Sequence, residues 1–180
     1  MSRLTAPQSH EIDPKARKVL DGVERALGFV PNMMRTMAAA PAVLTGYANL
    51  GAALAGGRLG ATLREKIALL AAQENGCDYC AAAHTALAGV EGLSVEAILD
   101  ARRGAAVDPR EQAALDFARA VLEQRGRVSD AELARVRSAG YADGDIAEIV
   151  ANVAHAIYTN YFNNVAGTDI DFPRVAELAA

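Results

Sequence analysis

Apolar residues recur every three or four positions along most of this chain, which is the period of an amphipathic α-helix. The first such segment ends near Gly28, and its apolar face carries Val19, Leu20, Val23 and Leu27. The last begins at Asp143, ends around Asn163 and Asn164, and carries Ile146, Ile149, Val150, Val153 and Ile157. No stretch alternates convincingly between apolar and polar residues as a strand does. The pattern predicts an all-α fold.

Capping residues, prolines and glycines divide this pattern into separate helices. Pro14 and Pro41 suit the first turn of a helix, and Ser129 with Glu132 fits a capping box. We therefore expect one helix to begin at the two cysteines and the others to span residues 14–28, 33–39, 41–54, 62–74, 94–103, 108–124, 129–140 and 143–164.

Length and composition narrow the class of protein. The 180 residues suit a single domain, 1–180, in which residues 1–12 form a flexible arm. Aromatic residues make up only 5% of the chain and Trp is absent, so the apolar mass is Ala, Leu and Val, which favours closely packed helices. The net charge is −4 without a basic run, which argues against nucleic acid as a partner.

The expected cellular compartment rests on two features that the sequence does not show. No apolar span approaches transmembrane length, and the polar N-terminus has no signal-peptide core. We expect a cytoplasmic protein with no membrane partner. In a reducing compartment, two cysteines spaced CxxC are more often catalytic or metal-binding than a structural disulfide.

The two cysteines stand at a predicted helix start. Asn75 and Gly76 tolerate the left-handed backbone that ends a helix, and the alanines after Cys80 favour a new one. Cys77 and Cys80 then lie in the first turn, where unpaired backbone N–H groups stabilise a thiolate. Two thiols so placed can cycle between dithiol and disulfide.

His84 shares a helical stripe with both cysteines, being four residues after Cys80 and seven after Cys77. An imidazole there can take the thiol proton, although a lone histidine on an Ala-rich helix is usually a packed residue. Zinc and two inert buried thiols are the rival interpretations of the CxxC pair. A structural zinc site needs four ligands. Beyond Cys77, Cys80 and His84 the one further candidate is His155, and there is no second CxxC, so we expect no metal.

Glu65 and Tyr79 allow two interpretations each. Thr62 and Glu65 fit a capping box, but in an antiparallel helical hairpin Glu65 lies at the height of His84 and can orient it, directly or through water. Tyr79, between the cysteines, suits a pocket wall or an interface. His155 suits the polar face of the last helix, and the amide- and aromatic-rich run over residues 158–164 suits a pocket, a subunit contact or a helix end.

These residues resemble a signature of the carboxymuconolactone decarboxylase/alkylhydroperoxidase D superfamily. That signature is a glutamate, eleven residues, and then C-x-[HY]-C-x-x-x-H, matched here by Glu65, Cys77, Tyr79, Cys80 and His84. The segments LGFVPN at 27–32 and FNNVAGTDIDFP at 162–173 resemble the peroxidase-related branch, so the resemblance covers nearly the whole chain. It implies a helical bundle in which a helical hairpin carries the CxxC at the N-terminus of a helix.

The resemblance also implies roles. Cys80 would be the thiolate oxidised to a sulfenic acid, Cys77 would donate a proton and then form the disulfide, and His84 with Glu65 would relay protons. Alkylhydroperoxidase D proper usually has histidine where this chain has Tyr79, a departure that bears on efficiency and on the reducing partner. The resemblance further implies a homo-oligomer, such as a dimer, trimer or hexamer, and a thiol reductant of lipoyl or thioredoxin-like type.

We therefore expect an antioxidant thiol peroxidase or disulfide oxidoreductase that reduces hydroperoxides without a cofactor. One rival is a carboxymuconolactone decarboxylase-type enzyme, whose chemistry does not need a cysteine pair. The other is a non-enzymatic metal-binding or redox-sensing helical module.

Overall fold

The computed structural model describes residues 2–175 and 178, and in that part of the chain every regular element is a helix. The fold is therefore all-α, as the sequence pattern predicts. The elements are a short 3-10 helix, η1 (Ser9–Glu11), followed by α1 (Pro14–Leu27), α2 (Asn32–Met37), α3 (Pro41–Ala55), α4 (Ala61–Glu74), α5 (Asp78–Val90), α6 (Val95–Arg102), α7 (Pro109–Glu123), α8 (Asp130–Ser138) and α9 (Asp143–Ala166).

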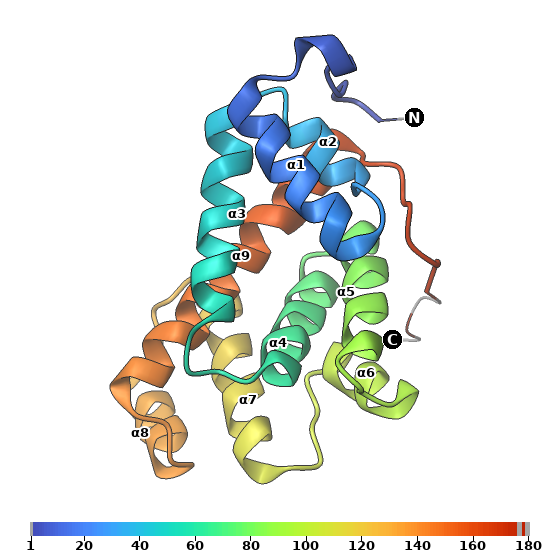
Figure 1. Cartoon of the computed structure of the whole chain (residues 1–180). Coiled ribbons are helices and arrows are strands. Elements are labelled where there is room, and N and C mark those ends of the chain that lie inside the picture. The colour runs from blue at the N-terminus through green and yellow to red at the C-terminus, as the bar shows by residue number, and fades with distance from the viewer. Residues whose placement is uncertain (1, 176–177, 179–180) are drawn as a thin grey trace.

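Helix α4 occupies the centre of the bundle, with α5, α6, α7 and α9 packed around it (Figure 1). Its sequence explains this position, because its middle is apolar on every side. Ile67, Leu69 and Leu70 are fully buried. Ile67 and Leu70 lie in one apolar cluster and Leu69 lies in another. A helix that is apolar all round has to be enclosed by others.

The hairpin formed by α4 and α5 turns at Gly76. Its φ of +58° lies in the left-handed region that favours glycine, so the prediction from Asn75 and Gly76 matches the backbone. Cys77 follows as the N-cap of α5. The turn therefore places both cysteines where the central helix ends.

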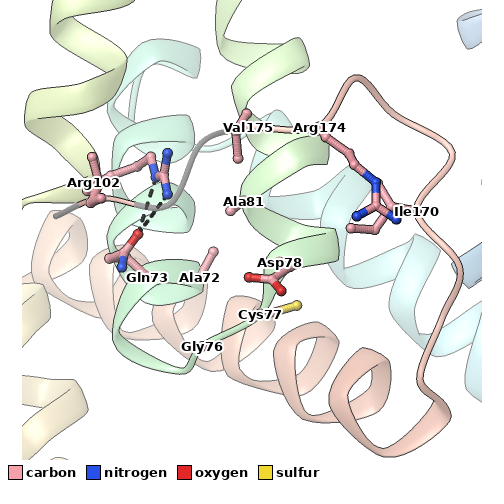
Figure 2. Close-up of a pocket in the computed structure, with 11 residues that line it drawn as sticks. Ala72, Gln73, Gly76, Cys77, Asp78, Ala81, Arg102, Ile170, Arg174 and Val175 are labelled. Atoms are coloured by element: carbon pink, nitrogen blue, oxygen red, sulfur yellow. Dashed lines mark hydrogen bonds between the residues drawn. The ribbon is translucent and has the colours of Figure 1, made fainter.

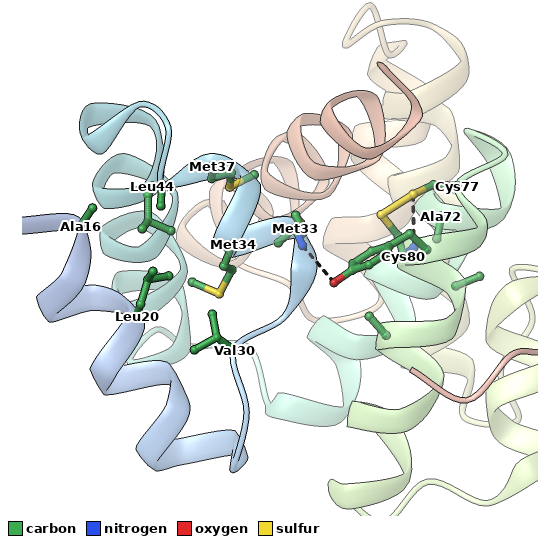
Figure 3. Packing of buried hydrophobic residues seen from close by; sticks show 14 residues of the cluster. Ala16, Leu20, Val30, Met33, Met34, Met37, Leu44, Ala72, Cys77 and Cys80 are labelled. Atoms are coloured by element: carbon green, nitrogen blue, oxygen red, sulfur yellow. Dashed lines mark hydrogen bonds between the residues drawn. A yellow bond between two sulfur atoms is a disulfide. The ribbon is translucent and has the colours of Figure 1, made fainter. Parts of the chain in front are cut away.

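Methionines of α2 fill the space between α1, α3 and the cysteines. Met33, Met34 and Met37 are buried in one cluster with Leu20 and Leu44, and Figure 3 shows this layer beside the disulfide. Unbranched thioethers adapt to an irregular gap between helices. The short α2 thus forms one wall of the region around Cys80.

The N-terminal segment meets the C-terminus of α9 and the residues that follow it. The backbone N–H of Arg3 donates to the carbonyl of Ala166 at 2.6 Å, and the Ser2 hydroxyl donates to Asp169 at 3.1 Å. After Gly167 the chain runs in extended form along the outside of α5 (Figure 1). In the described residues, no helix is both long and apolar enough to cross a membrane.

Candidate active site

Cys77 and Cys80 form a disulfide at the start of α5, with their Cα atoms 5.3 Å apart. Cys77 is the N-cap, and its Sγ accepts the backbone N–H of Cys80 at 3.2 Å. A cysteine so placed does what serine or aspartate usually does at a helix start. Both sulfur atoms are buried, so a reagent reaches them only through a cavity.

Asn163 contacts the sulfur of Cys80. Its Nδ2 donates to Cys80 Sγ at 3.3 Å and to the sulfur of Met33 at 3.2 Å, and its side chain is 3% exposed. Asn163 comes from α9, far from the CxxC in sequence. An amide N–H held there stabilises negative charge on Cys80 when the disulfide is reduced.

His84 and Glu65 are in direct contact. His84 Nδ1 lies 2.8 Å from Glu65 Oε2, and both side chains are partly buried. Because a carboxylate only accepts, Nδ1–H donates and the lone pair of the neutral ring is on Nε2. The hairpin places the two residues at the same height, without a bridging water.

The capping-box interpretation of Thr62 and Glu65 is wrong. Helix α4 begins at Ala61, its N-cap is Gly60, and no side chain caps it. Glu65 therefore lies one turn inside the helix, too far along to serve the first N–H groups. Its hydrogen-bond partner in the structure is His84.

Tyr79 anchors the C-terminal segment. Its hydroxyl donates to Asp171 Oδ1 at 2.9 Å and accepts the Met33 N–H at 3.3 Å, and its ring meets Phe172 edge-on at 5.8 Å. Burial is the main cause that raises the pKa of Tyr79 above its ordinary value; the Met33 N–H opposes this and Asp171 adds to it. Tyr79 is thus a neutral hydrogen-bonding wall.

A small cavity of about 90 Å³ lies beside Cys80. Its lining is mostly apolar and aromatic, and it includes His84, Asn163, Tyr47, Tyr79, Phe172, Met33, Met34 and Leu87. Cys80, His84 and Asn163 therefore share one cavity. Such a space admits a small, largely apolar molecule and holds few waters.

His84 also lines a second cavity of about 230 Å³ on its other side, together with Glu65 and His155. The His155 ring is stacked on Tyr47, with centroids 4.7 Å apart, and its Nε2 lies 3.4 Å from the Tyr47 carbonyl. Burial lowers the pKa of His155; the Tyr47 carbonyl opposes this and the charge of His84 adds to it. Burial, then the charges of Glu65 and Tyr158, raise the pKa of Tyr47 to about 12.

The largest of these cavities, about 340 Å³, lies on the other side of the disulfide, where it touches Cys77 and not Cys80. Its polar lining comes from Gln73, Asp78, Arg102 and Arg174, and Figure 2 shows the two arginines on either side of Cys77 and Asp78. The guanidinium of Arg102 donates from Nε and Nη2 to the side-chain oxygen of Gln73.

Metal-binding geometry is absent from the residues that the structure describes: no three His, Cys, Asp or Glu side chains gather in a way that would hold an ion. His155, the further ligand candidate from the sequence, is stacked against Tyr47 instead.

Sequence reasoning missed two residues of this site. The sequence places Asn163 in an amide-rich run and in the segment 162–173 without giving it a role. That run holds the CxxC turn: Asn75 donates to Asn160 at 2.9 Å and Asn164 donates to the Asn75 carbonyl at 2.9 Å. Asp171, the partner of Tyr79, lies in the same segment 162–173 and was likewise given no role. The available sign was the density of amides in an aromatic-poor chain.

Comparison with known proteins identifies a matching family model and several similar structures. Residues 41–124 match the model of the carboxymuconolactone decarboxylase family. Among solved structures, the chain is similar to an alkylhydroperoxidase AhpD core protein, an uncharacterized peroxidase-related protein from Ralstonia eutropha JMP134. The TM-score is 0.87 at 27% identity, over 94% of this chain and 92% of that chain.

Two further structures share the fold. An uncharacterized peroxidase-related protein from Silicibacter sp. TM1040 matches with a TM-score of 0.84 at 24% identity, over 93% of this chain and 91% of that one. The debrominase Bmp8, solved in complex with 2,3,4-tribromopyrrole, matches with a TM-score of 0.80 at 22% identity, over 95% and 92%. No curated protein matches the chain.

Proposed function

Because this chain belongs to the carboxymuconolactone decarboxylase/alkylhydroperoxidase D superfamily, we propose that it is a thiol-dependent peroxidase that cycles between a dithiol and a disulfide. The observation that carries the proposal is the shared cavity of Cys80 and His84, with Glu65 bound to the histidine and Cys77 bound to Cys80. A nucleophile, a base and a group that orients the base are therefore adjacent.

In the proposed cycle, His84 Nε2 takes the proton of the Cys80 thiol, and the resulting thiolate attacks the terminal oxygen of a hydroperoxide. The O–O bond breaks, the alkoxide takes a proton from His84, and Cys80 becomes a sulfenic acid. Glu65 stabilises the protonated imidazole through Nδ1. The Cys77 thiol then attacks Cys80 Sγ, its proton leaves with the sulfenic hydroxyl as water, and the disulfide seen in the structure forms.

The cavity beside Cys80 supports a small hydroperoxide as substrate. Its lining is mostly apolar, so the organic part of a hydroperoxide gains from burial while the O–O group meets Cys80 and His84. Tyr79 replaces the histidine usual in alkylhydroperoxidase D, and here it binds the C-terminal segment rather than the sulfur atoms. The proton relay in this proposal therefore runs through His84 alone.

Intact-mass spectrometry of the reduced protein, before and after cumene hydroperoxide, tests the proposal. We expect wild type to lose two hydrogens and Cys77→Ser to gain one oxygen on Cys80. Cys80→Ser is the matched control and should stay unchanged. Both thiols remaining reduced in wild type would refute the peroxidase function.

A second candidate is thiol-dependent debromination of a small aromatic ring. Tyr47, Tyr79 and Phe172 contribute aromatic rings to the cavity beside Cys80, and the debrominase Bmp8 shares the fold. Release of bromide from a bromopyrrole by the reduced protein would favour this candidate. A third candidate is a carboxymuconolactone decarboxylase-type enzyme. A decarboxylase-type reaction that survives in Cys77→Ser and Cys80→Ser would favour it.

We also propose that the chain acts as a homo-oligomer. One stripe of α9 exposes apolar side chains at helical spacing, namely Val150, Ala154, Tyr158, Tyr161 and Val165. A stripe of this kind on a surface helix marks an interaction face. Light scattering coupled to size-exclusion chromatography should give a multiple of the 18.8 kDa chain, and Tyr161→Glu with Val165→Glu should lower it.

A further inference from the structure

The cavity beside Cys77 has no part in the proposed attack on a peroxide, since it does not touch Cys80. We propose that it is the entry site of the reductant, and that the reductant is a small thiol carrying a carboxylate. This inference rests on the proposed dithiol–disulfide cycle, and it names which sulfur is attacked and what recognises the attacker.

Access decides which sulfur a thiol meets. Cys77 and Cys80 are 1% and 3% exposed, so neither sulfur is reached from open solvent. The Cys80 cavity is about 90 Å³ with an apolar lining, whereas the Cys77 cavity is about 340 Å³ with a charged one. A hydrated, charged thiol therefore enters more easily on the Cys77 side.

Stability of the leaving thiolate points the same way, although less strongly. Attack on Cys77 releases Cys80, whose sulfur has the Asn163 N–H and the nearby His84 as partners. Cys77 itself accepts the backbone N–H of Cys80, so it too would leave as a stabilised thiolate. Because both sulfur atoms have a donor, the difference in access is the stronger argument.

Charge in the cavity favours an acid. Among the lining residues that the structure describes, Arg102 and Arg174 contribute two guanidinium groups and Asp78 one carboxylate. Arg102 is 5% exposed and is fixed by two hydrogen bonds to Gln73. Arg174 is exposed at the cavity's rim, so its charge acts on an arriving molecule.

The exchange balances without a further reactant. A thiol loses its proton and its thiolate attacks Cys77 Sγ, the Cys77–Cys80 bond breaks, and Cys80 leaves as a thiolate that takes up a proton in turn. A second thiol then attacks the bound reductant's sulfur and releases Cys77. Two thiols are oxidised to one disulfide, and the protein disulfide is reduced to two thiols.

The test uses two thiols that differ in charge, N-acetylcysteine and its amide, on protein oxidised with diamide. We measure the rate of disulfide reduction by alkylation and intact mass. The ratio of the acid's rate to the amide's rate cancels changes that affect both thiols equally. We expect Arg174→Gln to lower that ratio about threefold, as suits one exposed ion pair. Arg127→Gln, which removes an exposed arginine outside the cavity, is the matched control and should leave the ratio unchanged.

A second measurement locates the site. Cys80→Ser and Cys77→Ser are equilibrated with the disulfides of the same two thiols, and mixed-disulfide formation is read by mass. We expect a preference for the acid on Cys77 and none on Cys80. An equal ratio in wild type and Arg174→Gln, an equal fall in Arg127→Gln, or an acid preference on Cys80 would each overturn the inference. Diamide forms the disulfide without peroxide, so a failed peroxidase assay leaves this test intact.

Discussion

On the Cys80 side of the disulfide, the cavity measures about 90 Å³ and is lined by apolar and aromatic side chains around His84 and Asn163. On the Cys77 side, it measures about 340 Å³ and includes two arginines. The CxxC motif itself contains no such asymmetry. It arises because Cys77 is the N-cap and Cys80 lies at the third helical position, so the two residues meet different neighbours.

The comparison teaches that one disulfide can serve two reactants through two entrances. Under the proposed function the peroxide meets Cys80, and under the further inference the reductant meets Cys77. Each entrance then selects its own chemistry, small and apolar on one side, larger and acidic on the other. Substitutions confined to one side should therefore affect one half of the cycle first.

The largest expected effect is that of His84→Ala, on the Cys80 side. Loss of the base should slow alkylation of Cys80 by iodoacetamide near neutral pH by about 100-fold, because general-base assistance contributes at least that much. The curve of alkylation rate against pH should move to higher pH for Cys80. Fragmentation mass spectrometry of the peptide resolves Cys77 from Cys80.

His10→Ala is the control for this substitution, since His10 is exposed in η1. It should leave both curves in place. If His84→Ala also leaves the Cys80 curve unchanged, the relay is refuted. If it moves the two curves equally, the two sides are not independent.

Asn163→Leu should give the next effect. Removing the N–H that Cys80 Sγ accepts should slow Cys80 alkylation roughly tenfold, the value of one hydrogen bond to a charged group. Cys77 alkylation should change little. Asn152→Leu, the same substitution on the same helix, removes a bond to the Glu148 carbonyl and is the control. Equal slowing in both variants would return Asn163 to a packing role.

Most of the fold could be predicted from the sequence, because the ends of a helix are determined by a few neighbouring residues. Ser94 caps α6, Ser129 and Glu132 form the capping box of α8, and Gly76 takes the left-handed turn. These signals depend on a few neighbouring residues. The wrong prediction, a capping box at Thr62 and Glu65, fits the same local pattern, but the N-cap is Gly60, two residues before Thr62.

The site was readable only where its residues share a hairpin. Cys77, Cys80, His84 and Glu65 are related by helical spacing and one turn, so counting residues aligns them. Asn163 reaches Cys80 from a helix 83 residues away. Both cavities also depend on the extended segment after α9, whose course no periodicity predicts.

Tyr79→Phe should affect both sides modestly, because Tyr79 anchors the segment that lines both cavities. The variant leaves the Met33 N–H and the Asp171 carboxylate without their shared partner. We expect the free energy of unfolding in urea to fall by about 1–2 kcal/mol. Tyr161→Phe, which keeps the apolar ring of the exposed α9 stripe and removes a hydroxyl alone, is the control and should change it by less than about 0.5 kcal/mol. Equal stability of both variants would remove the anchor role.

The smallest effect concerns His155, which lies beyond His84 on the Cys80 side and, we expect, stabilises the fold without joining the relay. Burial lowers the pKa of His155 below its ordinary value of 6.5, so the unfolded chain takes up this proton first as pH falls. The stability tied to the neutral ring is therefore complete above pH 6.5 and is lost as pH falls through the lowered folded pKa.

Urea denaturation at pH 7.5 and 5.0 measures that loss, and His155→Gln should reduce it by less than about 1.4 kcal/mol, the equivalent of one pKa unit. His10→Gln should show the wild-type difference. Cys80 alkylation in His155→Gln should match wild type at neutral pH, in contrast to His84→Ala. A shifted alkylation curve would instead extend the relay through the second cavity to His155. A pH dependence of stability equal to wild type would mean that its ring does not carry this linkage.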